Sequence, residues 1–320
     1  MSTLCVAVVQ EYTPHTLARG LDVAAGRVAE AAAQGASLVV FPETWLPGYP
    51  IWLDVCRDVA LWDHPPVKTV YRRLADESVA VPSDATHTLA DLARTHRVTL
   101  VMGVSERVDE GPGRGTLYNS ILTFGPDGAL RNHHRKLMPT YTERMVWGAG
   151  DADGLASVAI GDTRIGSLVC WEHWMPLARQ ALHDAGEDVH AALWPTVHEM
   201  HQVASRHYAF EGRCYVLAAG SLQRAGDLPS ELEPHASKVA EASQLVMRGG
   251  SAIIAPDGSY VAGPVFDEPT LLVATLDLSR VREERMTLDV TGHYQRAELL
   301  SMQVKRNSRL SSDDVAHVRS

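Results

Sequence analysis

The sequence lacks the features that mark several classes of protein. It contains no apolar run near the ~20 residues that a membrane-spanning helix needs. Its Lys and Arg residues number 29 against 39 Asp and Glu, a formal net charge of −10, and no dense basic run offsets that balance. Nucleic-acid binding depends on clustered positive charge. We therefore expect neither a membrane protein nor a nucleic-acid-binding protein.

Cysteine is also scarce. The four cysteines, Cys5, Cys56, Cys170 and Cys214, are widely spaced and form no CxxC pair. The N-terminus has no basic segment ahead of its short apolar run, so it does not resemble a signal peptide. We therefore expect reduced thiols and a cytoplasmic protein. Such a thiol is either a small buried apolar group or a nucleophile.

Motifs for the common metals and cofactors are missing too. His198 and His201 flank Glu199, but the zinc-protease spacing His-Glu-x-x-His does not occur. The glycine-rich segments 111–115 and 148–150 have no preceding strand in the right register and no following Lys-Ser/Thr. No Gly-x-Ser-x-Gly elbow is found. The sequence therefore predicts chemistry without metal and without cofactor.

Strands and helices alternate along the first part of the chain. Residues 4–10 and 37–41 are nearly continuous apolar runs, typical of strands covered on both faces. Between them apolar residues recur at steps of three and four from Leu17 to Ala32, and Gly35 follows as a helix C-cap. Ser83 is placed to cap a second helix ahead of a strand over 98–104. This order predicts an α/β fold.

Hairpins interrupt the alternation further along. Paired strand-like runs around turn residues are found at 117–134, 157–170 and 251–263. The pattern adds helices from Pro176 to Gly186 and over 199–213, and strands over 191–195, 215–220 and 271–277. The sheets should therefore be mixed rather than purely parallel. We expect one domain over residues 1–305 and a polar C-terminal tail over 306–320.

Three reactive residue types stand where apolar strands end. Glu43 follows the run that ends at Phe41, Lys136 follows a hairpin strand, and Cys170 ends the strand 165–170. Their ordinary alternatives are a solvated loop glutamate, a surface lysine and an inert buried thiol. Cys170 lies at a strand exit with a helix starting near Pro176. The positive end of that helix, with its free N–H groups, would favour a thiolate.

Taken together, these positions resemble the nitrilase superfamily of carbon–nitrogen hydrolases. The resemblance is carried by Val39-Val40-Phe41-Pro42-Glu43, by His134-Arg135-Lys136-Leu137-Met138-Pro139-Thr140 and by Gly166-Ser167-Leu168-Val169-Cys170-Trp171-Glu172. The segments occur in the family's order and at its spacing. Further similarity extends over 143–148, Trp194-Pro195 and 292–296. The run from Cys170 to Leu177 is similar to the true nitrilase branch.

The resemblance implies a four-layer α-β-β-α sandwich with two mixed β-sheets. It also implies a homodimer and larger spiral oligomers. In the site it implies that Cys170 is the nucleophile, Glu43 the base and Lys136 the group that stabilises negative nitrogen. Glu143 would hold Lys136, and its alternative is a helix-start or surface glutamate. We expect Tyr49, Trp171 and Trp194 to bind substrate, and His134, Glu172 and His173 to support the site.

The activity implied is hydrolysis of a nitrile to a carboxylic acid and ammonia through a thioimidate and a thioester. Two alternatives keep the fold and the nucleophile: an amide hydrolase and a cyanide-degrading enzyme. A third is a non-catalytic assembly protein, but a scaffold has no need for Glu43, Lys136 and Cys170 together.

Overall fold

The computed structural model describes residues 3–306, which form two seven-stranded sheets. The first sheet has the spatial order β14 (Thr270–Asp277), β1 (Thr3–Gln10), β2 (Leu38–Val40), β4 (Thr99–Arg107), β5 (Leu117–Phe124) and β6 (Leu130–Arg135), with β3 (Val79–Ala80) beside β4. The second has the order β11 (Leu222–Arg224), β12 (Leu245–Ile254), β10 (Tyr215–Ala219), β9 (Val189–Leu193), β8 (Thr163–Val169) and β7 (Val158–Ile160), with β13 (Tyr260–Phe266) beside β12.

Both sheets are mixed, as the interrupted alternation predicted. β1, β2 and β4 run parallel to one another, and so do β8, β9 and β10. The hairpin strands add antiparallel pairs at the edges, such as β4 with β5 and β5 with β6. Helix crossovers therefore join the parallel strands at the centre of each sheet, and the predicted hairpins add antiparallel strands at the edges.

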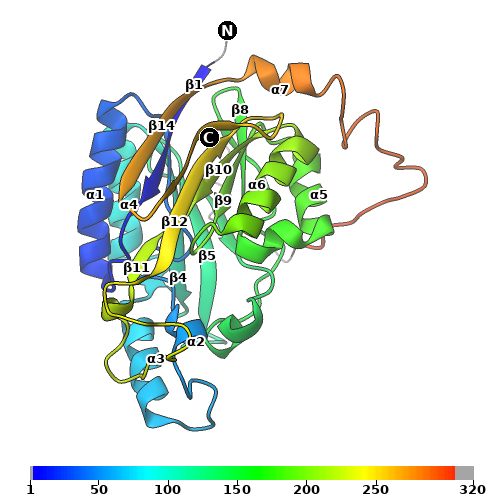
Figure 1. The fold of residues 1–320 in the computed structure, drawn as a ribbon. Helices are drawn as coiled ribbons and strands as arrows, with labels where there is room; N and C mark the ends of the chain where they lie inside the picture. Colours follow the sequence, from blue (N-terminus) through cyan, green and yellow to red (C-terminus); the bar gives the residue numbers. More distant parts are fainter. Residues whose placement is uncertain (1–2, 307–320) are drawn as a thin grey trace.

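Two helices cover the outer face of each sheet, which gives the order α-β-β-α (Figure 1). α1 (Leu17–Ala33) and α4 (Asp84–His96) cover the first sheet, and α5 (Pro176–Asp184) and α6 (Glu199–Gly212) the second. Alternation along β1 explains the packing: Val6 and Val8 join the apolar cluster between the sheets, while Ala7 and Val9 join the cluster beneath α1 and α4. The predicted four-layer sandwich is confirmed.

The predicted caps are also present. Ser83 accepts from the backbone N–H of Thr86 at the start of α4, and Gly35 takes a positive φ of 86° just after α1. That conformation favours glycine, because a Cβ crowds the backbone there.

The sequence did not predict the elements between β2 and β3. α2 (Trp52–Val55) and α3 (Pro65–Glu77) form a lobe beside the open end of the sandwich (Figure 1). Only Val70 and Leu74 of α3 are buried, so its apolar stripe is too narrow to stand out from the polar residues around it. The short helix α7 (Ser279–Glu284) and the 3₁₀ turns η1 (Tyr141–Met145), η2 (Cys170–Trp174) and η3 (Ala225–Asp227) complete the fold.

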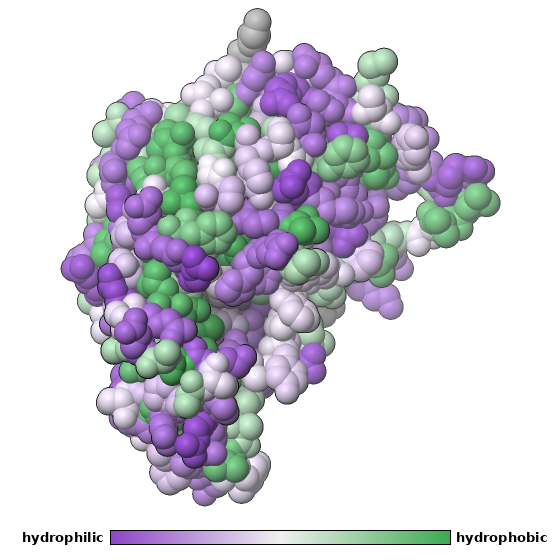
Figure 2. Space-filling model, viewed as in Figure 1, coloured by the Kyte–Doolittle hydropathy of each residue, from purple (hydrophilic) through white to green (hydrophobic). Residues whose placement is uncertain are grey.

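Hydrophilic residues are spread over the face drawn in Figure 2, with an apolar strip along β14 beside α1. Within residues 3–306 no helix combines the length and apolar character needed to cross a bilayer. Of the predicted polar tail only Arg306 falls in this range, and it donates to the carbonyl of Leu155 at 2.7 Å. The rest, residues 307–320, lies outside the described residues.

Candidate active site

Glu43 lies in the loop that leaves β2 and crosses toward the second sheet. Its backbone N–H donates to the carbonyl of Trp194, just beyond β9, at 3.3 Å, and its side chain is fully buried. β4 passes directly beneath this loop at Gly103, where a Cβ would overlap the carbonyl oxygen of Pro42 and the Cα of Glu43. Glycine at this position therefore permits the close approach that holds the carboxylate between the sheets.

Lys136 follows β6 immediately, and its ammonium is also fully buried. Its Nζ lies 2.9 Å from Glu43 Oε1 and 2.7 Å from Glu143 Oε2. The side-chain amide of Asn119 on β5 donates to the same Glu43 oxygen at 2.6 Å. The backbone carbonyl of Asn119 accepts the backbone N–H of Lys136 at 2.7 Å. A buried cation is tolerated here because two carboxylates surround it.

Glu143 was expected either to hold Lys136 or to be a helix-start or surface glutamate. It lies in the first turn of η1, where Oε2 accepts the backbone N–H of Thr140 at 2.8 Å. The same carboxylate pairs with Lys136, and the hydroxyl of Tyr49 donates to Oε1 at 2.9 Å. Glu143 is thus a helix-start residue and also the second partner of the buried lysine.

Cys170 begins η2 directly after β8, with a φ of 49° in the left-handed region that non-glycine residues rarely adopt. Its Sγ and one carboxylate oxygen each from Glu43 and Glu143 lie within 4.8 Å of one another. Strain of this kind costs on the order of 1–3 kcal/mol and is typical of functional positions. The four residues that the resemblance selected therefore meet at one point between the sheets.

Glu172 holds the turn that begins at Cys170 through hydrogen bonds to the backbone. Its carboxylate accepts the backbone N–H of Val169 at 2.7 Å and that of Leu137 at 2.8 Å, and His134 lies 3.0 Å away. It therefore ties the strand that ends at Cys170 to the strand that ends at Lys136. This contact matches the supporting role expected for Glu172 and His134.

Two carboxylates and a thiol could also form a metal-binding set. In this protein, however, the ammonium of Lys136 lies within 2.9 Å of both carboxylates. A divalent ion in the same space would be placed against that positive charge. The arrangement therefore fits acid–base chemistry better than a metal centre.

Burial changes the pKa values of Glu43 and Cys170. It raises the pKa of Glu43 to about 7, with Lys136 opposing and Glu143 reinforcing that rise. Burial and the Glu43 carboxylate raise the pKa of the Cys170 thiol well above its usual value. This differs from the thiolate that a helix dipole would favour, because α5 begins only at Pro176 and desolvation outweighs it. A thiol of raised pKa is neutral at neutral pH and must lose its proton before it can serve as a nucleophile.

A base with a pKa near 7 makes activity pH-dependent in a definite direction. Glu43 can take the thiol proton only as a carboxylate, and a raised pKa means that this form is lost as the pH falls through about 7. We expect kcat/KM to rise across that pH and then level off. A pH–rate profile on the purified enzyme measures this limb. An acid limb centred near the ordinary value of 4.5 instead would contradict the role of burial at Glu43.

A cavity of about 350 Å³ opens above the thiol. The buried Cys170 and Glu143 line it together with Tyr49, Ile51 and the half-exposed Trp171. Its remaining lining residues are Asp54, Thr140, Tyr141, Thr142, Pro195, Thr196, His198 and His201. The volume suits a small organic molecule.

Of the three residues expected to bind substrate, the structure places two at this cavity. Tyr49 and Trp171 line it. The side chain of Trp194 is instead fully buried, stacked between His173 at 4.6 Å and His201 at 4.5 Å between ring centroids. An apolar aromatic next to a strand end packs into the core as readily as into a pocket, and the sequence did not distinguish these outcomes. Trp194 therefore packs against His201, which lines the cavity.

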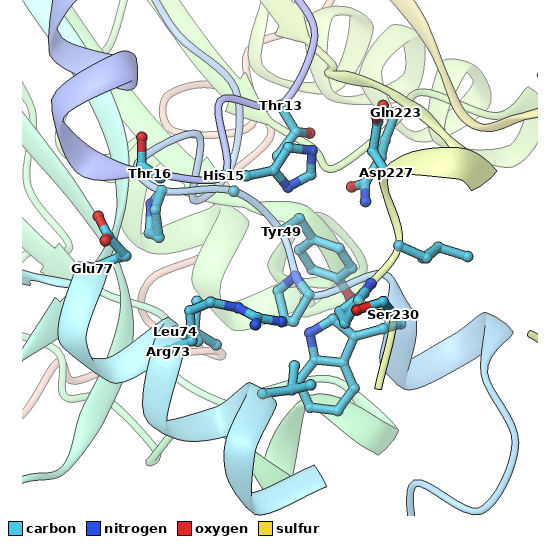
Figure 3. A pocket seen from close by; sticks show the side chains of 17 residues that line it. Thr13, His15, Thr16, Tyr49, Arg73, Leu74, Glu77, Gln223, Asp227 and Ser230 are labelled. Carbon is cyan, nitrogen blue, oxygen red and sulfur yellow. The ribbon is translucent and has the colours of Figure 1, made fainter. Parts of the chain in front are cut away.

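A second cavity, of about 400 Å³, lies on the other side of Tyr49. Figure 3 shows His15, Arg73, Glu77, Asp227 and Ser230 around it, contributed by α3, by the segment after β1 and by the segment after β11. Cys170 is not among the described residues that line it. The larger cavity is therefore not where the thiol can react.

No motif in the sequence pointed to Asn119. It is buried on β5 and reaches Glu43 because β5 pairs with β4, the strand beneath the Glu43 loop, in the register that sets Asn119 opposite Ser105. An asparagine in a strand carries no motif of its own. The pairing of the strands, rather than any local pattern, recruits it to the site.

Known proteins are similar to this chain in sequence and in fold. The family model described as carbon-nitrogen hydrolase matches residues 5–286. A nitrilase of Paraburkholderia phymatum is 37% identical over 89% of this chain and 81% of its own length. A bifunctional nitrilase/nitrile hydratase of Lupinus angustifolius is 38% identical over 92% and 82%. An aliphatic nitrilase of Sinorhizobium fredii is 35% identical over 95% and 96%.

Among solved structures, a carbon-nitrogen hydrolase from Helicobacter pylori has a TM-score of 0.70 at 18% identity, covering 94% of this chain and 100% of that one. An amidase mutant from Nesterenkonia, solved after addition of acrylamide at its active-site cysteine, has a TM-score of 0.64 at 19% identity, with coverage of 89% and 97%. At such identities the likeness extends to the fold alone.

Proposed function

Because this chain belongs to the carbon–nitrogen hydrolase family, we propose that it hydrolyses an organic nitrile to the carboxylic acid and ammonia with Cys170 as nucleophile. The observation that carries the proposal is the convergence of a thiol, a carboxylate of raised pKa and an ammonium between the sheets, where the thiol also lines a cavity. The names of the relatives support the choice of nitrile as substrate.

The first half of the reaction joins the thiol to the nitrile carbon. Glu43 takes the proton from Cys170 as sulfur attacks, and one C–N π bond becomes a lone pair on nitrogen. Lys136 and the backbone N–H of Trp171 stabilise this negative nitrogen, which then receives the proton held by Glu43. Donors of this kind are worth about 2.7–4 kcal/mol each in acyl-transfer sites. The product of this half is a neutral thioimidate.

The second half releases ammonia and then the acid. Glu43 takes a proton from water, which adds to the thioimidate carbon, and the nitrogen leaves as ammonia after protonation. The resulting thioester is attacked by a second water in the same way, which breaks the C–S bond and restores the thiol. Glu143 holds Lys136 throughout, because its carboxylate contacts Nζ through both oxygens.

Loss of the sulfur instead of the nitrogen from the first tetrahedral adduct would yield an amide. The relative named as a bifunctional nitrilase/nitrile hydratase supports measuring this second product. We expect a panel of aliphatic, aromatic and arylaceto nitriles to give ammonia and acid as the main products. The matching amides and cyanide should react more slowly. Faster turnover of an amide or of cyanide would replace the nitrilase assignment with the corresponding alternative.

We also propose that two copies associate through the helices that cover the second sheet. The outer faces of α5 and α6 expose the apolar side chains Leu177, Met200, Val203 and Phe210, with exposed fractions of 69%, 60%, 50% and 47%. Such a patch is more typical of an interface than of free surface. Sedimentation should give at least twice the 34.9 kDa of one chain, and larger spiral assemblies would add to that mass. A stable monomer would refute the association.

A reducing compartment such as the cytoplasm suits this chemistry. The four cysteines are all free in the structure, and the nucleophile must remain a thiol to work.

A further inference from the structure

A chain of buried polar side chains leads from the backbone of Cys170 toward the helices on the second sheet. His173 Nδ1 lies 2.7 Å from the carbonyl oxygen of Cys170, and His173 Nε2 lies 3.0 Å from His190 Nε2. His190 Nδ1 lies 2.8 Å from a carboxylate oxygen of Glu187. These three side chains are at most 2% exposed. The reaction steps above use none of them.

The hydrogen-bond partner of each histidine ring nitrogen indicates whether that nitrogen donates or accepts. A carbonyl oxygen can only accept, so His173 Nδ1 donates to Cys170. Burial lowers the pKa of His173 well below its usual value, so this ring is neutral and its Nε2 must accept from His190. Burial would keep Glu187 protonated, but His190 and His183 lower its pKa to about 2. Both ring nitrogens of His190 therefore face hydrogen-bond acceptors, the carboxylate of Glu187 at Nδ1 and the neutral ring of His173 at Nε2.

The ring of His190 lies in the core without exposed surface. Glu187 faces its Nδ1 with one carboxylate oxygen, and the other oxygen accepts from the hydroxyl of Tyr208. The ring of Tyr208 stacks on His190 with 3.8 Å between centroids. A charge buried at this position would be tolerated because a carboxylate contacts the ring directly.

The carbonyl at the near end of the chain belongs to the peptide unit that joins Cys170 to Trp171. Burial raises the pKa of the Cys170 thiol, but a hydrogen bond from the Trp171 N–H, at the other end of that unit, acts to lower it. Hydrogen bonds at the two ends of one amide strengthen each other, because electron density drawn toward oxygen makes the N–H a better donor.

We propose that Glu187, His190 and His173 are positioning residues that hold and polarise the peptide unit between Cys170 and Trp171. The charge on His190 is the source of the polarisation, Glu187 maintains that charge, and His173 passes it to the carbonyl. The Trp171 N–H then stabilises the thiolate and, later, the negative nitrogen of the thioimidate. The effect on catalysis rests on the proposed function, but the effect on the thiol does not.

Other groups face this chain from the elements packed around it. On the side of the helices, Arg179 pairs with Glu211 at 2.6 Å, and His183 lies between Glu187 and Glu211 at 3.2 and 3.3 Å. Burial opposes a charge on His183, but these two carboxylates raise its pKa to about 9. The remaining neighbours are Cys214, Arg285 and His201, and around the thiol Glu43, Lys136 and Glu143. Within residues 3–306, Glu187 is the carboxylate that contacts His190.

The protonation of the chain can be measured directly on the wild-type protein. Nitrogen-15 NMR of histidine-labelled enzyme at neutral pH should show one histidine with both ring nitrogens protonated that is lost in His190→Gln, and one neutral Nδ1–H tautomer that is lost in His173→Gln. A neutral His190 would overturn the proposal. This measurement needs neither substrate nor a variant at Glu187.

Glu187→Gln tests the charge itself, because the amide has the same shape and can still donate to a neutral His190. We expect kcat to fall about tenfold with KM within about twofold, a fraction of what loss of a whole oxyanion donor costs. Alkylation of Cys170 by iodoacetamide at neutral pH, followed by mass spectrometry of its peptide, should slow by a similar factor. Unchanged kcat and unchanged alkylation in a folded Glu187→Gln enzyme would overturn the proposal.

Tyr208→Phe is the matched control. It removes another hydrogen bond to Glu187 and perturbs the same buried cluster, but it leaves the ion pair with His190 in place. We expect kcat and the alkylation rate to remain within about twofold of wild type. An equal loss in Tyr208→Phe and Glu187→Gln would show that the cluster acts only through packing, which would overturn the proposal. A wild-type protein with a charged His190 but no activity on nitriles would refute the proposed function alone.

Discussion

Cys170→Ala should abolish nitrile hydrolysis while the protein keeps its fold. Without the thiol no thioimidate can form, and loss of a nucleophile that works with its base typically costs roughly 10⁴-fold or more in kcat. Cys170→Ser should be nearly as inactive, because a hydroxyl is a much weaker acid than a thiol and Glu43 would have to deprotonate it. Ammonia release measures turnover, and circular dichroism with sedimentation reports on fold and assembly.

Cys214→Ala is the matched control for this loss. Cys214 is also a buried thiol next to a strand, but it does not line the cavity that Cys170 lines. We expect Cys214→Ala to retain activity with a stability change of about 1 kcal/mol. Mass spectrometry of enzyme trapped during turnover should find the acyl group on the Cys170 peptide. Full turnover in Cys170→Ala would remove the nucleophile assignment.

Lys136→Met should lower kcat by roughly 10²–10³-fold, because the developing negative nitrogen loses its charged donor. The same change leaves Glu43 and Glu143 buried together without their cation. Breaking a buried ion pair from one side typically costs about 3–5 kcal/mol, so the variant should also melt at a lower temperature. The two effects must be separated before the loss of activity can be assigned to chemistry.

The double variant Lys136→Met with Glu143→Gln makes that separation. It removes one of the two like charges, so we expect it to recover part of the lost melting temperature. It should remain as inactive as the single variant, since no positive charge has been restored. Thermal denaturation and kcat measured on both variants provide the comparison. A folded Lys136→Met enzyme with less than about a tenfold loss in kcat would contradict the electrostatic role of the lysine.

The long elements and the positions of the reactive residues were predictable because their signals are local. Apolar runs and the three- and four-residue spacing between Leu17 and Ala32 depend only on neighbours along the chain, and the structure has β1, α1 and β2 there. Glu43, Lys136 and Cys170 stand at strand ends in three motifs that can be read without coordinates. By contrast, α3 buries only two residues, and its pattern was too weak to predict.

Properties that depend on the surroundings of a side chain were not predictable in the same way. A helix after Cys170 suggested a thiolate, but full burial beside a carboxylate raises the pKa of the thiol instead. Trp194 was expected to touch substrate and is buried between two histidines. Each outcome depends on which atoms from distant segments surround the residue.

The sequence by itself determined the family, the mixed α/β layers and the residues that we propose to react, because short motifs and hydrophobic periodicity are properties of the chain. Only the tertiary structure decided which groups surround them: Asn119 on the Glu43 carboxylate, Tyr49 on Glu143, and the buried histidines behind Cys170. These contacts join residues from different strands and helices. They exist because the two sheets pack face to face and exclude water from the space between them.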